Sequence, residues 1–404
     1  MLFSAQTASM FAGFFASIIL GRWMEPVEMG RFAFCLSIIV VTGLLFEFGV
    51  SSAGARVLAL AGDRDGERQA LGALVLMTLA ISVGFSLFIA AVAKPIDLIF
   101  DKDVRWLFIA TAALAFFQPF QLFIEQSCQG LNQIRRLSVF QLTMSGCYLL
   151  ALIVLAATRC LSAGTALGAY LASIGISSAW TLIQMQPSFM GAARYVKLTL
   201  KETRGYGLNV YLARVSGLAS SRSDQLAIGY FLVDTAPLGM YAIVQKFSNP
   251  IAMIGRSLAT TRFRAFARLT RVPPRITRWN AAALIAASIG LIVIGPFVLR
   301  FVFPKYSEAA PLLLPFAAMN LFVGLFQPYN IFLASHGRGA ELRNIVLIAG
   351  AATIAALAFA VPRFGIAGAA WTGAGAMALD YILHLLYYRR FRRTLEDAAP
   401  ATKG

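Results

Sequence analysis

The sequence predicts an all-α integral membrane protein of about twelve transmembrane helices, in two parallel-related six-helix bundles around a central cavity. The first observation is composition: 59% of the 404 residues are apolar, 13% are charged, and the mean hydropathy is +0.72. A soluble domain has roughly 45–50% apolar and about 25% charged residues. The second is that the apolar residues fall in blocks of about 20, long enough to cross a ~30 Å hydrocarbon core as helix. The third is an internal repeat.

Each apolar block is predicted to form one membrane-spanning helix. The run LGALVLMTLAISVGFSLFIAAV, for example, does not alternate apolar and polar residues as the strands of a membrane barrel do. We expect the first block to be a retained helix, because no basic n-region or small-residue cleavage site marks it as a signal peptide. The predicted spans are 4–22, 29–50, 70–93, 105–126, 137–157, 163–186, 206–230, 236–258, 279–303, 309–335, 343–361 and 364–388.

Basic residues predict that both termini face the cytoplasm. With the N-terminus inside, the inward connections and the C-terminal tail carry 22 Lys and Arg, against 9 in the outward connections. Short cytoplasmic loops are enriched in these residues. The segment 261–278, where arginines are interleaved with Phe263, Phe266 and Leu269, is expected to lie as a basic amphipathic helix on the anionic cytoplasmic leaflet.

The two halves of the chain resemble each other at a constant offset. FQPFQLFIEQSCQG begins at Phe117 and FQPYNIFLASHGRG at Phe326, 209 residues later. MGRFA at Met29 and LGMYA at Leu238 have the same offset. A repeat unit of six helices is even, so both halves enter the membrane in the same sense and are related by an axis along the membrane normal.

The repeat defines the predicted domains: an N-terminal bundle over 1–186, a cytoplasmic linker over 187–205, a C-terminal bundle over 206–388 and a basic cytoplasmic tail over 389–404. Repeats of this kind place a substrate site at their interface near the bilayer midplane, and rocking of one half against the other gives alternating access. The architecture therefore indicates a transporter without naming its cargo.

Sequence signatures of an enzyme or a nucleic-acid-binding protein are absent. The chain has two histidines and four cysteines without HExxH, CxxC, GxSxG or Walker A patterns, so we expect no catalytic residues, metal or cofactor. The net charge of +17 comes from basic residues that lie between apolar blocks without aromatic interleaving. This pattern indicates topology and contact with anionic lipid, not nucleic acid.

Ionisable residues inside the predicted spans are the candidates for function, because burying each in the membrane costs about 2.5–3.5 kcal/mol on the insertion scale. Each also has a structural interpretation: snorkelling for Glu125, Lys246 and Arg256, a local pair for Asp380 and His384, and mutual neutralisation for Arg222 and Asp224. Glu47 has no basic residue within a helical turn. The full set is Glu47, Glu125, Arg214, Arg222, Asp224, Lys246, Arg256, Asp380 and His384.

Gln118 and Gln327 precede the prolines of the two FQP segments. A proline inside a span frees a carbonyl group of the preceding turn, and these glutamines could hydrogen-bond that backbone. They could also line a cavity for sugar hydroxyls. Both interpretations stay open.

The chain resembles the polysaccharide and O-antigen flippases of the multidrug/oligosaccharidyl-lipid/polysaccharide exporter superfamily. The resemblance rests on ASIILGRWMEPVEMGRFAFCLSIIVVTGLLFEFGVSSAGARVLAL (16–60), on SRSDQLAIGYFLVDTAPLGMYAIVQKF (221–247), with Asp224 at the family's acidic position, and on FGIAGAAWTGAGA (364–376). It implies a multi-pass protein of the bacterial inner membrane that moves an undecaprenyl-diphosphate-linked oligosaccharide to the periplasmic leaflet, with a cationic cavity. Expected partners are this lipid-linked cargo, anionic lipids, and the glycan polymerase and glycosyltransferases of the pathway.

A diphosphate cargo needs fixed positive groups, and arginine suits it because its guanidinium stays charged. We therefore predict substrate binding by Arg214 and Arg222, with Arg256 and the glutamines Gln118 and Gln327 as further candidates. Glu47 and Asp224 are the candidates for ion coupling. The alternatives are a multidrug cation antiporter of the same superfamily, a membrane-embedded glycan polymerase or transferase, and a non-transporting scaffold for glycan assembly.

Overall fold

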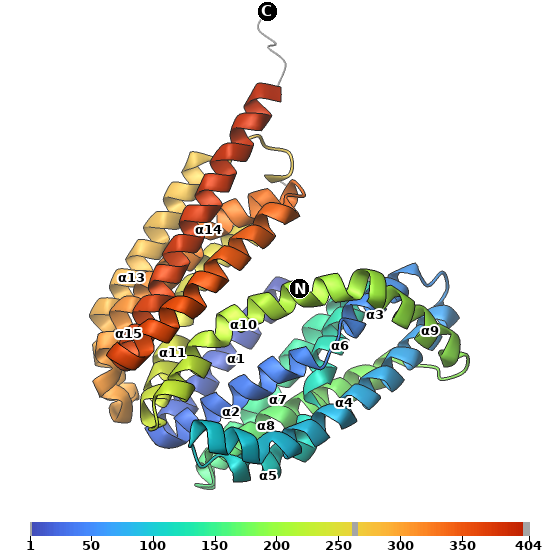
Figure 1. Cartoon of the computed structure of the whole chain (residues 1–404), viewed down its shortest axis with the longest axis horizontal. Helices are drawn as coiled ribbons and strands as arrows, with labels where there is room; N and C mark the ends of the chain where they lie inside the picture. The colour runs from blue at the N-terminus through green and yellow to red at the C-terminus, as the bar shows by residue number, and fades with distance from the viewer. Residues whose placement is uncertain (1, 261–265, 399–404) are drawn as a thin grey trace, which may run out of the picture. The chain divides into compact units, whose positions relative to one another are not determined.

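The computed structural model describes residues 2–260 and 266–398, and throughout these ranges the regular elements are helices, without a strand (Figure 1). The chain forms two compact units. Unit 1 comprises Met1–Leu218 and Val233–Gly239, and unit 2 comprises Ala219–Leu232 and Met240–Gly404. The predicted all-helical fold is confirmed. The predicted domain boundaries at 187–205 stay a prediction.

Unit 1 contains the first half of the helices and the start of α10. Its elements are α1 (Leu2–Trp23), α2 (Pro26–Leu45), α3 (Val50–Leu60), α4 (Arg64–Phe100), α5 (Arg105–Ala115), α6 (Gln118–Gly130), α7 (Ile134–Ala157), α8 (Ala163–Met185), α9 (Ala192–Glu202), the π-helical turn η1 (Thr203–Gly207) and the first part of α10 (Leu208–Phe231).

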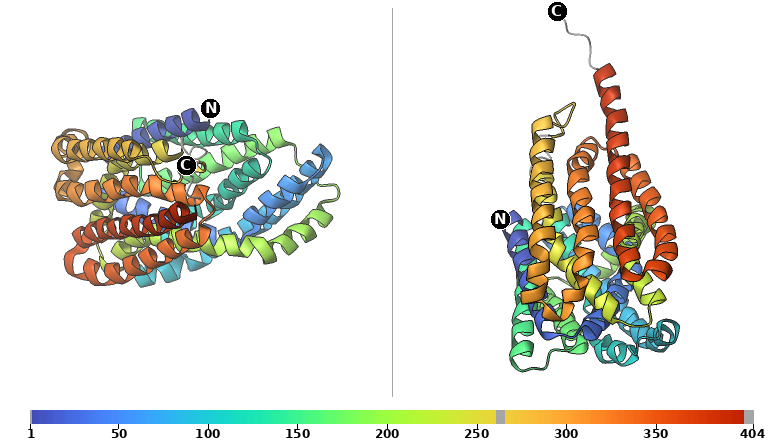
Figure 2. Two further views of the ribbon diagram at one scale, coloured as in Figure 1. Left: turned by 90° about the horizontal axis from the view of Figure 1, so that it is seen from above. Right: turned by 90° about the vertical axis from the view of Figure 1, so that its left-hand side faces the viewer.

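Unit 2 contains the rest of α10 and the remaining helices. These are α11 (Ala236–Thr260), which begins in unit 1, α13 (Pro274–Val302), the 3-10 helix η2 (Pro304–Leu312), α14 (Leu313–Ser335) and α15 (Gly339–Ala398). Helix α14 packs against both α13 and α15, which the three views show as neighbouring ribbons (Figures 1 and 2).

Eight stretches of helix in the described residues are long and apolar enough to cross a membrane. Helices α10 and α11 are not among them: Arg214, Arg222 and Asp224 interrupt the first, and the polar run around 245–249 lowers the hydropathy of the second. One of the eight stretches lies in α15, which contains two predicted spans. The count of twelve stays a prediction.

Gly365 divides α15 at the place where the sequence predicts a boundary between two spans. Its φ of 56° and ψ of −139° are not helical, and such a backbone conformation suits glycine. A Cβ on Gly368 would overlap the carbonyl group of Ala360. In a continuous helix these residues would be about 12 Å apart along the axis. The chain therefore reverses direction here, and α15 is two helices.

Two predicted spans are broken in the structure. Span 29–50 ends as α2 at Leu45, and after a turn the chain continues as α3, with Gly49 in the left-handed region at φ 80°. Span 105–126 divides into α5 and α6 around Phe117, just before Pro119. Proline favours a new helix start because it lacks the N–H that an unbroken helix would use.

The predicted amphipathic helix over 261–278 is not continuous where this segment is described: Phe266 is helical, and 274–278 form the start of α13. Residues 261–265, with Phe263, lie outside the described residues, and 267–273 are turn and loop ahead of α13. Phe266 is fully buried against Phe332 and Tyr388, and the Val272 N–H donates to the Tyr388 hydroxyl at 3.0 Å. Packing on its own unit outweighs the surface position that periodicity alone suggested.

The starts of α2 and α11 meet in a reciprocal contact within unit 1. A Cβ on Gly30 would overlap the carbonyl group of Thr235, and a Cβ on Gly239 would overlap that of Pro26. Both glycines permit this close approach because they lack a side chain. Gly30 and Gly239, and likewise Pro26 and Thr235, are separated by the repeat offset of 209, so equivalent residues exchange equivalent contacts. This reciprocity supports the predicted repeat, because an inverted repeat would place the starts of equivalent helices at opposite faces.

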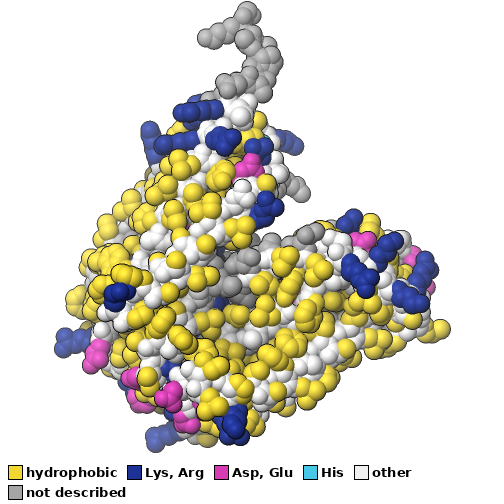
Figure 3. Space-filling model, in the orientation of Figure 1, with side chains coloured by type: hydrophobic (Ala, Val, Ile, Leu, Met, Phe, Trp, Pro, Cys, Tyr) yellow, Lys and Arg dark blue, Asp and Glu magenta, His cyan; other side chains and the backbone are white. Residues whose placement is uncertain are grey.

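Charged side chains gather at the ends of the helices in each unit, and apolar side chains cover the middle (Figure 3). In unit 1, basic side chains cluster where α3, α4 and α9 come together (Figures 1 and 3). Large apolar residues in the middle of the helices, such as Leu87, Ile153 and Val293, are exposed. This distribution is typical of helices whose outer surface faces lipid.

Candidate functional site

Asp224 is the centre of a polar network inside unit 2. Its Oδ2 accepts hydrogen bonds from the Tyr241 hydroxyl at 2.7 Å and from Gln245 Nε2 at 3.1 Å, and its Oδ1 accepts the Gln225 N–H at 2.7 Å. Tyr241 and Gln245 lie four positions apart on α11, so they present one face to α10. The partners of the carboxylate are therefore mostly side chains of another helix.

Arg222 adjoins this carboxylate, and Lys246 adjoins Arg222. Arg222 Nη1 donates to Gln225 Oε1 at 3.3 Å, and Gln225 Nε2 donates to Gln245 Oε1 at 2.7 Å. Lys246 of α11 is close enough to Arg222 to repel it electrostatically, while Asp224 attracts the same guanidinium. Gln225 thus joins Arg222 to the network, which holds two basic residues and one acid.

The network continues to α14 through Ser248. The Ser248 hydroxyl donates to the carbonyl oxygen of Gln245 at 3.0 Å, and Asn320 Nδ2 donates to the Ser248 hydroxyl at 3.1 Å. Ser248 and Asn320 are buried. The chain of contacts extends over α10, α11 and α14 of unit 2, so a change at Asp224 can reach three helices.

Arg214 belongs to a second network, in unit 1. It lies within electrostatic reach of Glu125 on α6, whose carboxylate accepts from Gln121 Nε2 at 3.4 Å. The Tyr170 hydroxyl of α8 contacts Gln121 Oε1 at 3.4 Å, and the ring of Tyr148 packs edge-on against that of Tyr170. Within the described residues, the Nη1 atom of Arg214 is buried and makes no hydrogen bond.

Glu47 lies at the break between α2 and α3 and is 3% exposed. Its Oε2 accepts the Gly49 N–H at 3.0 Å and its Oε1 accepts the Ser51 N–H at 2.6 Å. Free N–H groups at a helix start favour a carboxylate through hydrogen bonds and through the helix dipole. The sequence shows no basic partner for Glu47, and in the structure its partner is the backbone at the start of α3.

The remaining predicted site residues lie apart from these two networks in the contacts described. Gln118 is buried at the start of α6, and its Oε1 lacks a partner among the described residues, while Gln327 is half-buried in α14. Arg256 is exposed on α11. In the described residues, no three His, Cys, Asp or Glu side chains are arranged to hold a metal ion.

Asp380 and His384 form the local pair that their spacing predicts. His384 Nδ1 lies 2.9 Å from the Asp380 carbonyl oxygen and 3.5 Å from Asp380 Oδ1, and its ring stacks on Phe326 at 4.8 Å. Both residues are buried within unit 2.

Sequence reasoning missed the uncharged members of both networks. Gln225, Tyr241 and Gln245 surround Asp224, and Gln121 and Tyr170 adjoin Glu125. A search restricted to ionisable residues passes over them. Amide side chains inside apolar spans would have been the available signal, because burying an amide without a partner is costly.

The sequence matches the profile of one protein family. The family is described as "Polysaccharide biosynthesis protein", and the match covers residues 1–270, about two thirds of the chain. A search of curated proteins found no significant match.

Solved structures show the same fold at low sequence identity. The lipid II flippase MurJ in an inward closed conformation gives a TM-score of 0.75 at 11% identity, covering 98% of this chain and 89% of that one. An inward-facing multidrug resistance MATE family transporter of the MOP superfamily gives 0.72 at 14% identity, covering 96% of both chains. The MATE multidrug transporter DinF-BH gives 0.66 at 14% identity, covering 98% and 96%.

Proposed function

Because the chain belongs to the polysaccharide biosynthesis protein family, we propose that it is a flippase for an undecaprenyl-diphosphate-linked oligosaccharide. It moves this cargo from the cytoplasmic to the periplasmic leaflet of a bacterial inner membrane by alternating access. The observation that carries the proposal is the pair of arginines on α10, in a chain with the fold of the lipid II flippase MurJ. Pathway polymerases and glycosyltransferases are its proposed partners.

The cargo diphosphate is the group that Arg214 and Arg222 would bind. Guanidinium groups stay charged in poorly hydrated surroundings and donate paired hydrogen bonds to phosphate oxygens. The buried and unbonded Nη1 of Arg214 supports this role, since a buried donor without an acceptor is costly. Arg256, Gln118 and Gln327 are further candidates for contact with the cargo, the glutamines with its sugar hydroxyls.

Ion coupling is assigned first to Asp224. Anionic cargo near Arg222 competes with the carboxylate for the same positive charge, and a proton or Na⁺ bound at Asp224 removes that competition. Release of cargo then releases the ion. Glu47 is the second candidate, and its backbone hydrogen bonds leave it less free to exchange partners.

A multidrug cation antiporter is the second candidate function, favoured by the structural likeness to MATE transporters. A cation site needs acidic and aromatic groups facing the ligand. Arg222 lies near Asp224 and Lys246 lies near Arg222, so two basic residues accompany one acid, and this excess favours anionic cargo.

The test is glycan delivery in a deletion strain complemented with variants. Arg214→Ala and Arg222→Ala should each lower delivery at least tenfold and cause lipid-linked glycan to accumulate. Arg204→Ala is the matched control, since Arg204 is an exposed arginine close to the start of α10. Full delivery by both variants would refute the diphosphate contact. Loss of drug efflux without glycan accumulation in the deletion strain would support the antiporter.

Both termini are proposed to be cytoplasmic. A periplasm-active reporter fused after Asp234 should be active, and the same reporter fused after Arg271 should be silent. The opposite pattern would reverse the orientation.

A further inference from the structure

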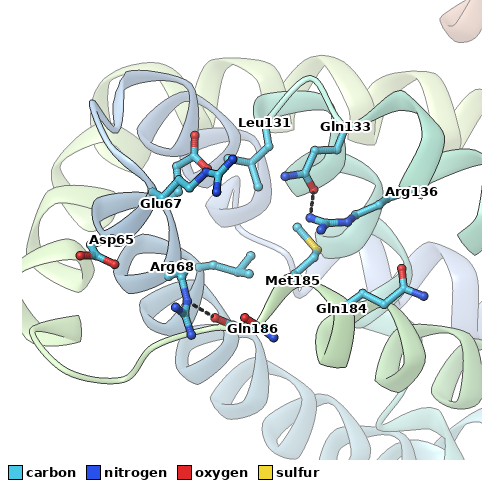
Figure 4. Close-up of a pocket in the computed structure, with 11 residues that line it drawn as sticks. Asp65, Glu67, Arg68, Leu131, Gln133, Arg136, Gln184, Met185 and Gln186 are labelled. Atoms are coloured by element: carbon cyan, nitrogen blue, oxygen red, sulfur yellow. Dashed lines mark hydrogen bonds between the residues drawn. The ribbon is translucent and has the colours of Figure 1, made fainter.

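A cavity of about 470 Å³ opens at one end of unit 1, and no residue of α10 is part of its lining (Figure 4). It lies where the start of α4, the turn between α6 and α7, and the end of α8 come together. Pockets of roughly 300–1,000 Å³ hold small ligands. The predicted topology places this end on the cytoplasmic side.

Three arginines line the cavity, and two of them are held in place by its walls. Arg68 Nε donates to the Gln186 carbonyl oxygen at 2.9 Å, and Arg136 Nη1 donates to Gln133 Oε1 at 2.6 Å (Figure 4). Each bond uses one nitrogen of a guanidinium that has five N–H donors. Arg64 is the third. Oriented guanidinium groups with remaining donors suit phosphate oxygens.

The lining of the cavity keeps a net positive charge although it includes acidic residues. Asp65 and Glu67 also line it, so three basic side chains face two acidic ones, and Asp65 lies at the edge far from Arg136 (Figure 4). Asp63 already accepts the Gly66 N–H at the start of α4. An anion in the cavity would therefore be bound by the arginine side chains and not by the N–H groups at the start of α4.

Part of the lining is apolar and consists of Leu71, Leu131 and Met185. Leu71 and Met185 belong to the buried core of unit 1, and Leu131 packs against it. A ligand with a phosphate and a short aliphatic part would satisfy both surfaces. Such a ligand would join the ends of four helices.

We propose that this cavity is a binding site for a phosphate ester anion. The same chemistry is offered by the headgroup of an anionic phospholipid and by a soluble phosphate. The site is separate from the proposed cargo contacts, so it can be tested without measuring transport.

The experiment measures the melting temperature of the purified full chain in vesicles by tryptophan fluorescence. One arm compares phosphatidylcholine vesicles with vesicles containing increasing phosphatidylglycerol; the other adds inorganic phosphate to phosphatidylcholine vesicles at constant ionic strength. We expect a saturable rise in melting temperature. The double variant Arg68→Gln/Arg136→Gln should shift the half-saturating concentration at least tenfold, since each lost charged contact is worth roughly that factor.

Arg135→Gln is the matched control, because Arg135 is exposed, adjacent to Arg136, and not part of the lining. Gln184→Glu adds a negative charge to the lining while keeping all three arginines, so it should also weaken the response. A response to the lipid alone identifies a headgroup site, and a response to phosphate as well identifies a soluble ligand. No saturable response in either arm, or equal responses of Arg135→Gln and the double variant, would overturn the proposal.

Discussion

Glu47 in unit 1 and Asp224 in unit 2 are acidic residues in predicted spans, yet their carboxylates have different kinds of neighbours. Glu47 accepts two backbone N–H groups from the turn that follows it. Asp224 accepts one backbone N–H and two side-chain donors, Tyr241 and Gln245, from a different helix. The first arrangement is local, and the second depends on how two helices pack.

The difference indicates which carboxylate can change its state while the fold persists. Backbone donors at a helix start cannot turn away without unwinding the helix, whereas a tyrosine hydroxyl and a glutamine amide can rotate to new partners. A group that exchanges an ion must tolerate such rearrangement. We therefore expect Glu47 to stabilise the α2–α3 break and Asp224 to take part in transport.

The largest effect is expected for Glu47→Ala, which removes both hydrogen bonds at the start of α3. The loss should lower the free energy of unfolding by about 3 kcal/mol or more, because two buried N–H groups lose a charged acceptor. Glu47→Gln keeps one acceptor oxygen and should lose less. Denaturant unfolding in detergent, followed by tryptophan fluorescence, measures both. Equal stability of Glu47→Ala and the native protein would remove the distinction between the two carboxylates.

Asp224→Asn should affect transport more than stability. The amide oxygen can still accept from Tyr241 and Gln245, and only the Gln225 N–H loses its acceptor, so we expect the free energy of unfolding to fall by about 1 kcal/mol. Glycan delivery should fall about tenfold, which corresponds to about 1.4 kcal/mol, and should no longer depend on the ion gradient. If Arg222→Gln/Asp224→Asn restores delivery, the two residues form a structural pair and the coupling role is wrong.

The smallest effect on glycan delivery is expected for Tyr241→Phe, which removes one donor to Asp224 and keeps the ring that packs on Phe316 at 4.9 Å. Stability should fall by about 1–2 kcal/mol, as for one hydrogen bond to a charged group. Tyr206→Phe, at an exposed tyrosine whose ring still faces Arg56 after the change, is the control and should be neutral. A change in the pH dependence of delivery for Tyr241→Phe alone would connect this hydroxyl to the coupling step.

The sequence predicted several local features correctly. The boundary near 362–364 coincides with the reversal at Gly365, and the spacing of Asp380 and His384 predicts their contact. These features depend on neighbours along the chain. A prediction was wrong where contacts with residues distant in the sequence determine the position of a side chain. Phe266 was expected on a membrane surface and is buried by Phe332 and Tyr388.

The candidate site around Asp224 also has features that the sequence reveals and features that only the structure shows. Arg222 and Asp224 could be identified because ionisable residues stand out in an apolar span. Their actual connection passes through Gln225 and α11, which no spacing on α10 can reveal. The offset of 209 is visible in the sequence, whereas the overlap of Gly30 with Thr235 and of Gly239 with Pro26 is not.

The sequence by itself determined that this chain is helical, apolar enough to enter a membrane and built from a repeat, because helix length, hydropathy and internal similarity are properties of the linear chain. The tertiary structure decided which polar groups meet. Rotation of a helix about its axis by a fraction of a turn changes every partner on its buried face, and that rotation is set by packing against helices far away in the sequence. Asp224 therefore owes its partners on α11 to the packing of unit 2, while Glu47 finds its partners in the adjoining turn.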